Sequence, residues 1–346
     1  MKYLSLWRVW LKTYALAGLA GWVAQASSIP LPWMIGPLFV TAGLRVSGGV
    51  VNAPIYGRQI GQWGVGLALG LYFTPAVVIE IVREWPFILA SCILAFGLSA
   101  MGTYLLWRKF GVKLSTAYFS AAIGGASEMA VLAEKNGGQL DLVAAAHSLR
   151  VMIVVVTIPF AYQYLGVHGD GQDIGNLIPF DWLGIGALLA VSAFGIICAR
   201  IIRLPNPFIL GALISVAIIT GVGSRWSSWP VELSAVAQLL IGVSLGVRFN
   251  SEFLRQAPRL VIGISVYTIL SLLLSLIFAV VVSRLSGIDV PTMVLGTTPG
   301  GIAEMCITAK VLHLGVAVVT VFHVIRMGIV LVLTQPIYTL YWKRFE

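Results

Sequence analysis

Gly124-Gly125-Ala-Ser127-Glu128-Met129 recurs later in this chain as Gly300-Gly301-Ile-Ala-Glu304-Met305. Further motifs recur at the same offset in residue number, or at one smaller by a single position: His147-x-x-Arg150 and His323-x-x-Arg326; Gln62 before Gly66-x-x-x-Gly70 and Gln238 before Gly242-x-x-x-Gly246; Pro32-x-x-x-Gly36 and Pro207-x-x-x-Gly211. Chance agreement of rare residue types at one nearly constant offset is improbable. We therefore infer that the chain consists of two copies of one unit, an internal duplication.

The composition places the chain in a membrane. Hydrophobic residues make up 59% of it and charged residues 10%, and the mean hydropathy is +0.95. A soluble domain carries about 25% charged residues. The net charge of +9 does not indicate a nucleic-acid partner, because no basic run is longer than Arg108-Lys109. The three cysteines lie singly in apolar stretches, which favours inert thiols over a disulfide framework or a thiolate metal site.

Each half contains six apolar segments, in a first repeat over residues 1–170 and a second over 182–346, joined by a linker over 171–181. The predicted segments are 13–28, 32–51, 59–82, 86–107, 115–134, 141–166, 182–202, 207–223, 231–249, 258–284, 291–310 and 315–342. Several tryptophans fall at their ends, as expected of an aromatic belt. The fold class expected is an all-α polytopic membrane protein.

The distribution of basic residues predicts how many segments cross. If all twelve crossed from an inside N-terminus, seven basic residues would fall outside. If the fifth segment of each half is re-entrant or broken and returns to its own side, fifteen basic residues lie inside and three outside. Each half then has five crossings, so the repeats are inverted, both termini are cytoplasmic and the linker is external. Residues 1–26 resemble a signal peptide, but their membrane counterpart in the second half favours a retained first helix.

The fifth segment carries the paired glycines, Ser127 and the two glutamates. Glycine pairs weaken a helix and Pro299 removes a backbone donor, so we expect the chain to unwind there. The restarting helix would point a positive dipole end into a cavity, which suits an anion. Glu128 and Glu304 cost roughly 2.5 to 3.5 kcal/mol each to bury charged and alone, so each must be protonated, paired or hydrated.

The His-x-x-Arg motifs leave two interpretations open. One is a structural Glu-Arg bridge in each half, involving Arg150 and Arg326. The other is binding, with the arginines gripping a carboxylate and His147, His323 or a glutamate carrying a coupling proton. Gln62 and Gln238 accompany glycines that favour close helix packing, and their amides are candidates for neutral hydrogen bonds to a substrate. His168 and His313 have no partner in the duplication, and we treat both as incidental.

These motifs resemble the membrane AbrB family, also labelled AbrB duplication proteins and ammonia monooxygenases. The resemblance rests on 32–38, 204–213, both Gly-Gly-x-x-Glu-Met motifs and both His-x-x-Arg motifs, and it spans nearly the whole chain. The family's labels include transporter, regulator and monooxygenase. Four dispersed histidines do not fit copper or di-iron ligation, and the soluble basic module of a DNA-binding regulator is absent from the sequence.

The sequence therefore predicts a secondary transporter of a small organic anion such as a carboxylate, coupled to H⁺ or Na⁺, in a bacterial cytoplasmic membrane. We expect no enzymatic activity, no cofactor beyond the coupling ion and no nucleic-acid partner. The expected partners are the anionic substrate and membrane lipid, and a homo-oligomer is compatible with the sequence. The alternative is a non-transporting membrane sensor, regulator or assembly partner whose buried charges are internal bridges. A channel is disfavoured because few predicted helices carry a polar stripe.

Overall fold

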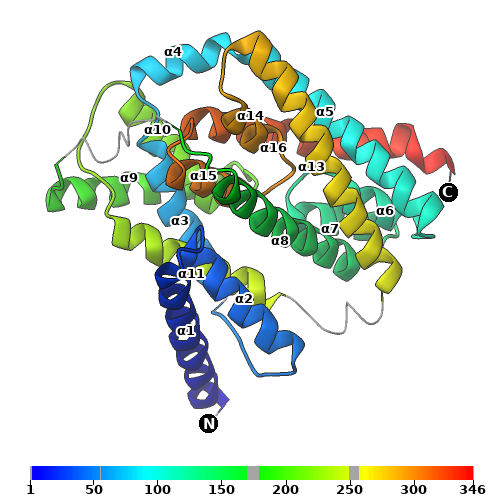
Figure 1. Cartoon of the computed structure of the whole chain (residues 1–346), viewed down its shortest axis with the longest axis horizontal. Helices are drawn as coiled ribbons and strands as arrows, with labels where there is room; N and C mark the ends of the chain where they lie inside the picture. Colours follow the sequence, from blue (N-terminus) through cyan, green and yellow to red (C-terminus); the bar gives the residue numbers. More distant parts are fainter. Residues whose placement is uncertain (1, 55, 170–178, 249–256, 346) are drawn as a thin grey trace. The chain divides into compact units, whose positions relative to one another are not determined.

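The computed structural model describes residues 2–54, 56–169, 179–248 and 257–345, which form helices joined by short turns and contain no strand (Figure 1). The helices of the first half are α1 (Lys2–Ala26), α2 (Pro32–Val46), α3 (Gly57–Gly70), α4 (Pro75–Arg83), α5 (Trp85–Tyr104), η1 (Leu105–Lys109), α6 (Leu114–Ala121), α7 (Ala126–Lys135) and α8 (Leu140–Tyr164). Those of the second half are α9 (Trp182–Ile201), α10 (Pro207–Gly221), α11 (Val231–Val247), α13 (Pro258–Ser286), α14 (Val290–Thr297), α15 (Ile302–Val311), α16 (Val316–Leu340) and η3 (Trp342–Phe345). The predicted linker lies largely outside the described residues.

Five stretches of the described chain are long and apolar enough to cross a membrane: α5 with η1, α8, α9, α13, and α16 with η3. A sixth is added if the bent pair α3 and α4 counts as one span, and α10 and α11 are shorter apolar helices. A straight crossing needs about 20 residues. The chain is thus an all-α, multi-pass membrane protein, and the ten-crossing inverted topology stays a prediction.

The predicted segment 59–82 is not one straight helix. α3 and α4 meet at an angle of 91°. The last turn of α3 tightens, because the amides of Tyr72 and Phe73 bond the carbonyls of Leu69 and Gly70. Pro75 then opens α4 and disfavours helical backbone in the residue before it. Hydropathy alone gave no signal for this bend.

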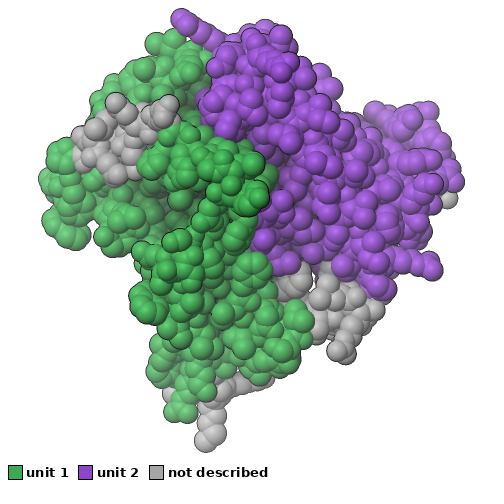
Figure 2. Space-filling model, viewed as in Figure 1, with its two compact units in different colours: residues 1–82, 158–251, 306–317 green, residues 83–157, 252–305, 318–346 purple. Residues whose placement is uncertain are grey.

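The chain forms two compact units, and each unit takes residues from both halves of the sequence (Figure 2). Unit 1 consists of residues 1–82, 158–251 and 306–317. Unit 2 consists of residues 83–157, 252–305 and 318–346.

In unit 1 the glycine motifs bring helices of opposite halves together. α3 packs on α10, and α11 packs on α2 (Figure 1). A Cβ at Gly66 would collide with the Ile209 carbonyl of α10, and one at Gly242 would collide with the Met34 carbonyl of α2. Gly70 and Gly246, one turn on, meet α10 and α2 in the same way. The predicted packing role of the Gly-x-x-x-Gly spacings is therefore confirmed.

The backbone repeats as well as the sequence. Positive φ angles occur in pairs at the same offsets as the sequence motifs: Ser28 with Arg203, Leu31 with Asn206, Gly48 with Gly223, Gly111 with Gly287, and Gly137 with His313. L residues rarely adopt such angles, so their recurrence is what a duplicated unit predicts. His313 is not incidental, since it holds the left-handed position that ends α15 as Gly137 ends α7.

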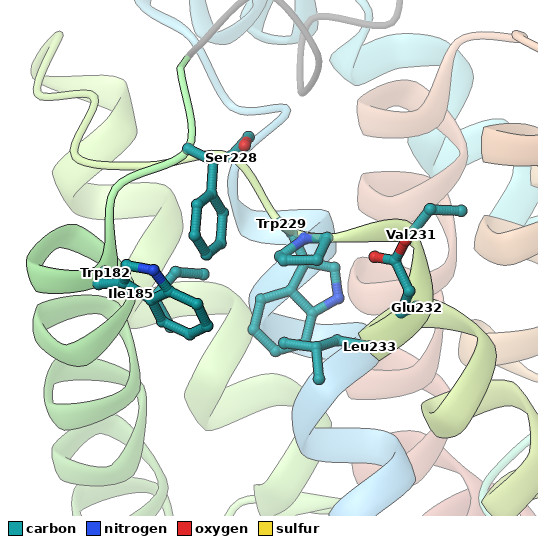
Figure 3. Close-up of a pocket in the computed structure, with 9 residues that line it drawn as sticks. Trp182, Ile185, Ser228, Trp229, Val231, Glu232 and Leu233 are labelled. Carbon is teal, nitrogen blue, oxygen red and sulfur yellow. The ribbon is translucent and has the colours of Figure 1, made fainter.

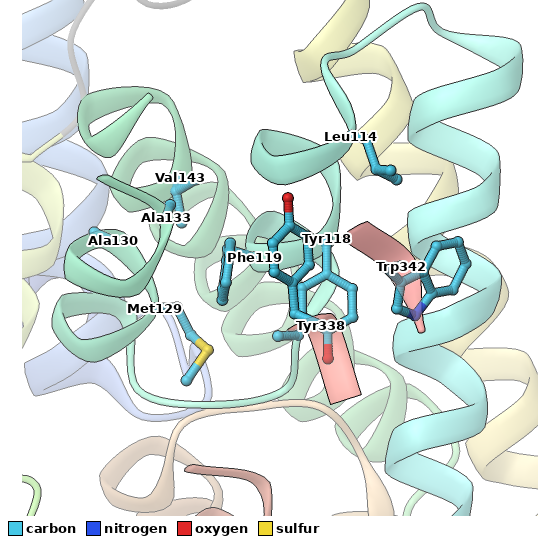
Figure 4. Close-up of a cluster of buried hydrophobic side chains, with 10 residues drawn as sticks. Leu114, Tyr118, Phe119, Met129, Ala130, Ala133, Val143, Tyr338 and Trp342 are labelled. Atoms are coloured by element: carbon cyan, nitrogen blue, oxygen red, sulfur yellow. The ribbon is translucent and has the colours of Figure 1, made fainter. Parts of the chain in front are cut away.

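Unit 2 contains both helix breaks, and α15 runs from unit 2 into unit 1. An apolar cluster in unit 2 joins α6, α7 and α8 to the end of α16, where Tyr118, Phe119 and Tyr338 pack ring to ring (Figure 4). The Tyr118 hydroxyl donates to the Thr334 carbonyl at 2.9 Å. This core fixes the first broken helix against α16.

Candidate functional site

The first predicted fifth segment is broken at residues 122–125. α6 ends at Ala121, Ala122 and Gly125 take extended conformations with ψ of 134°, and α7 begins at Ala126. The Lys113 ammonium donates to the Gly137 carbonyl at 2.8 Å, and the Gln139 amide donates to Thr116 Oγ1 at 3.1 Å. The start of α6 and the end of α7 therefore lie together, and the segment is a helical hairpin. Its re-entry into the membrane stays a prediction.

The second break lies at residues 298–301, between α14 and α15. Thr298 is extended with ψ of 140°, and the Gly300 amide bonds the Thr298 carbonyl at 2.8 Å across Pro299. The hydroxyls of Thr297 and Thr298 donate back to α14 carbonyls. The predicted unwinding is thus confirmed in both halves.

The paired glycines provide space rather than unusual φ angles. A Cβ at Gly125 or Gly301 would collide with the carboxylate of Glu128 or Glu304, three residues on. The first glycine of each pair is crowded instead by the methionine five residues on, with 2.7 Å from a Cβ at Gly124 to Met129 Cε. Each glutamate side chain therefore folds back over the start of its own half-helix, where the dipole is positive.

Each arginine binds the carbonyl end of the first half-helix. Arg150 Nη1 donates to the Ala122 carbonyl at 3.0 Å and lies 3.4 Å from that of Ala121. Arg326 donates to the carbonyls of Thr297 and Thr298 at 2.9 and 3.0 Å. A helix end leaves four carbonyls without intrahelical partners and carries negative partial charge, so a buried guanidinium suits it.

Each histidine is held between its arginine and the same half-helix. Arg150 Nη2 donates to His147 Nδ1 at 3.0 Å, and His147 Nε2 lies 2.8 Å from the Phe119 carbonyl. The second half repeats this with His323 Nδ1 at 2.9 Å from Arg326 and Nε2 at 2.8 Å from the Leu295 carbonyl. Arginine can only donate, so Nδ1 accepts and Nε2 carries the proton. Both histidines are neutral in this arrangement.

Arg150 does not bridge to Glu128 in the described structure. Its polar contacts are with carbonyls of 120–122, with His147 and with the hydroxyl of Tyr267, which itself donates to the Ala121 carbonyl at 2.7 Å. In the first half, the arginine therefore binds the backbone of the helix break rather than the glutamate.

α8 and α16 link the two breaks. α8 contacts the first break through Arg150, and one turn later Val154 lies 3.2 Å from a Cβ placed on Gly300 of the second. α16 does the reverse, with Arg326 on the second break and Val330 packed against Ile123 of the first. Because one helical turn rises about 5.4 Å, the breaks lie close together across these two helices.

The predicted site residues divide between the units. The glycine pairs, Ser127, both glutamates, both histidines and both arginines belong to unit 2. Ser127 is exposed, Glu128 half-buried and Glu304 buried. Gln62 and Gln238 belong to unit 1, where Gln238 lines a cavity of about 20 Å³ beside Ser234 and Lys310. Such a cavity holds about one water.

Sequence reasoning missed the side chains that support the breaks from α5 and α13. Ser99 accepts from the Ile123 amide at 3.3 Å, and Ser275, its counterpart in the second half, lies 3.5 Å from the Thr297 carbonyl. Tyr267 occupies the position equivalent to Ser91. The offset that relates the two glycine pairs, applied to α5 and α13, would have revealed the serine pair.

This geometry defines a class of protein: an all-helical membrane protein with two linked helix breaks. At each break, a carboxylate lies at the start of the second half-helix and a guanidinium binds the end of the first. Over residues 33–341 the chain matches the family described as transition state regulatory protein AbrB, and it belongs to that family. It is 28% identical over 353 residues to YhjN of Bacillus subtilis (strain 168), named as uncharacterised, with 94% of this chain and 91% of YhjN covered. It is 24% identical over 319 residues to a candidate regulator AbrB of Escherichia coli (strain K12), with 90% of each chain covered.

Proposed function

We propose that this protein is a secondary transporter that moves a small organic anion, of the carboxylate class, through the cytoplasmic membrane by alternating access. The observation that carries the proposal is the pair of linked breaks, because transporters place substrate and ion sites at the ends of discontinuous helices. The starts of α7 and α15 each offer amide donors and a positive dipole end to an anion. The proposal needs no catalysis and no cofactor.

Glu128 and Glu304 give this arrangement a means of coupling. Each carboxylate folds over the start of its half-helix, against Gly125 or Gly301. An ionised glutamate there competes with an anionic substrate for the same dipole and repels it. Protonation removes the repulsion, so the anion and a proton would bind together.

A proton fits better than Na⁺ as the coupling ion. Sodium sites in broken helices use carbonyl oxygens of the unwound backbone. Here guanidinium groups hold the carbonyls of Ala122, Thr297 and Thr298 at 2.9 to 3.0 Å. A second cation at the same oxygens would be repelled. The arginines then serve to shape the breaks, and a direct grip of Arg150 or Arg326 on the substrate stays a prediction.

The test is flux in proteoliposomes over a panel of carboxylates, amino acids and ammonium, with a pH gradient or a Na⁺ gradient. Glu128→Gln and Glu304→Gln mimic protonated glutamates. We expect them to retain substrate exchange at equal pH and to lose uptake driven by the pH gradient. Glu134→Gln is the matched control, since it removes an exposed carboxylate from the same helix α7. Absence of flux for every compound, with the fold intact, would remove the transport proposal. Gradient-driven uptake by both variants would remove only the coupling role.

The second candidate function is a membrane regulator that transports nothing. The family description and the name of the Escherichia coli relative favour it. It predicts no flux, together with a regulatory phenotype that survives Glu304→Gln.

A further inference from the structure

A pocket of about 780 Å³ lies in unit 1, between the start of α9 and the turn that leads into α11. Figure 3 shows Trp182 on one side and Trp229 on the other, with the Glu232 carboxylate turned toward the hollow. Glu232 carries the only charge among the described residues that line it. Nothing in the proposed transport mechanism uses this pocket.

The aromatic wall is held in place by specific contacts. Phe180 and Trp182 stack edge to face with ring centroids 4.8 Å apart. Asp181 between them accepts from the Gly184 amide at 2.7 Å, capping α9, and its own amide donates to Ser227 at 3.1 Å. Gly184 has no room for a side chain because the Trp226 carbonyl lies against it. The start of α9 is therefore fastened to the 226–229 turn.

The chemistry of the lining selects a cation. Aromatic faces attract ammonium groups, and a carboxylate beside them adds a direct counter-charge. The indole N–H of Trp229 is buried, so this side chain offers its ring rather than a donor to a ligand. An ammonium group meets the requirements of both the rings and the carboxylate.

The surroundings indicate that such a group comes from a lipid. The pocket lies at the ends of α9 and α11, where tryptophans mark the membrane interface. Leu183 and Val231, beside it, are 83% and 73% exposed and offer apolar surface for acyl chains. The positions equivalent to Trp229 and Glu232 in the first half are Ala53 and Tyr56, so the repeat does not supply a second copy.

We propose that this pocket binds the headgroup of one zwitterionic phospholipid, with its ammonium between the aromatic rings and Glu232. The predicted topology places it in the external leaflet.

The test is native mass spectrometry of the detergent-solubilised protein, equilibrated with equal amounts of phosphatidylethanolamine and phosphatidylglycerol of identical chains. The wild type is expected to retain phosphatidylethanolamine about five-fold over phosphatidylglycerol. Glu232→Gln and Trp229→Leu should each lose most of this preference. Glu80→Gln, which removes an exposed carboxylate of α4 outside the pocket, should keep it.

Equal retention of both lipids by the wild type would overturn the proposal, and so would an unchanged preference in both pocket variants. Soluble glycerophosphoethanolamine serves as a further arm. If the soluble compound fails to displace the lipid, the headgroup and the acyl chains bind together, as proposed. If it displaces the lipid at equal concentration, the ligand of the pocket is not a lipid and the proposal is overturned. Because Glu232 is exposed, its substitution leaves the fold intact.

Discussion

Arg326→Met is the substitution with the sharpest expected effect on the second break. It keeps the length and apolar stem of the side chain and removes the guanidinium. The carbonyls of Thr297 and Thr298 then lose donors at 2.9 and 3.0 Å, and His323 loses the donor that fixes its ring. The hydroxyls of Thr297 and Thr298 cannot replace these donors, because they already bond α14.

The magnitude follows from the two carbonyls. Each carbonyl keeps a second donor, because Ser275 lies 3.5 Å from that of Thr297 and the Gly300 amide bonds that of Thr298 at 2.8 Å. The substitution therefore removes one hydrogen bond from each, at about 1 to 2 kcal/mol, which gives about 2 to 4 kcal/mol for the pair. Side-chain hydrogen bonds in membranes average nearer to about 0.6 kcal/mol, and removing a buried charge recovers some desolvation energy. We therefore expect a loss near the lower limit, about 2 kcal/mol, which raises the population of the locally opened state about 30-fold.

The assay is the labelling rate of Cys92 by a thiol reagent in a background where Cys198 and Cys306 are replaced by alanine. Cys92 is buried on α5, one turn before Ala95, which shares an apolar cluster with Val330, one turn after Arg326 on α16. When reclosing is fast, labelling follows the open population. Arg284→Met, an exposed cation in the last turn of α13, should change the rate by about two-fold at most. If Arg326→Met is labelled no faster than Arg284→Met, the guanidinium does not hold the break.

Three further outcomes are expected. Gly125→Ala should displace the glutamate carboxylate and lower substrate affinity or flux in proteoliposomes, whereas Gly97→Ala, which meets open space, should not. Gly66→Val should destabilise the α3–α10 contact by about 2 kcal/mol or more in thermal unfolding, against a small change for Gly18→Val. Tyr267→Phe removes one donor from the Ala121 carbonyl and should cost about 1 kcal/mol in the same measurement, and an unchanged midpoint would contradict that contact.

The broken helices could be predicted from the sequence because glycine pairs act locally. Two adjacent glycines followed by a glutamate weaken a helix whatever surrounds it. The interface role of Gly66 and Gly242 was also predictable, since small residues one turn apart indicate close packing. The choice of partner helix was not, because it depends on contacts between opposite halves.

The role of the arginines could not be read from side-chain spacing. One of the two interpretations of the sequence was a bridge between Arg150 and Glu128, since those are the opposite charges of one half. In the structure backbone carbonyls, rather than the glutamate, accept the hydrogen bonds of Arg150. Every residue has a backbone carbonyl, so the residue types do not show which ones the arginine will bind. The usable signal was the break itself, because a helix that stops inside a membrane leaves carbonyls that a nearby donor must satisfy.

The aromatic pocket was missed for a related reason. Trp182 and Trp229 were interpreted only as interface markers, since nothing in their spacing places α9 beside the 226–229 turn. That proximity depends on Asp181, Gly184 and Ser227. None of these three residues belongs to a motif that the sequence repeats.

The exchange of glycine contacts in unit 1 has a consequence for the ancestry of the chain. Gly66 of α3 packs against the backbone of α10, and Gly242 of α11 packs against the backbone of α2. By the internal repeat, α11 is the counterpart of α3 and α10 is the counterpart of α2. A single ancestral copy would carry both the glycine surface and the helix that packs against it, but these two surfaces would not contact each other within one copy. It would have had to fold as a homodimer, so the fusion of two copies converted a contact between subunits into a contact within one polypeptide.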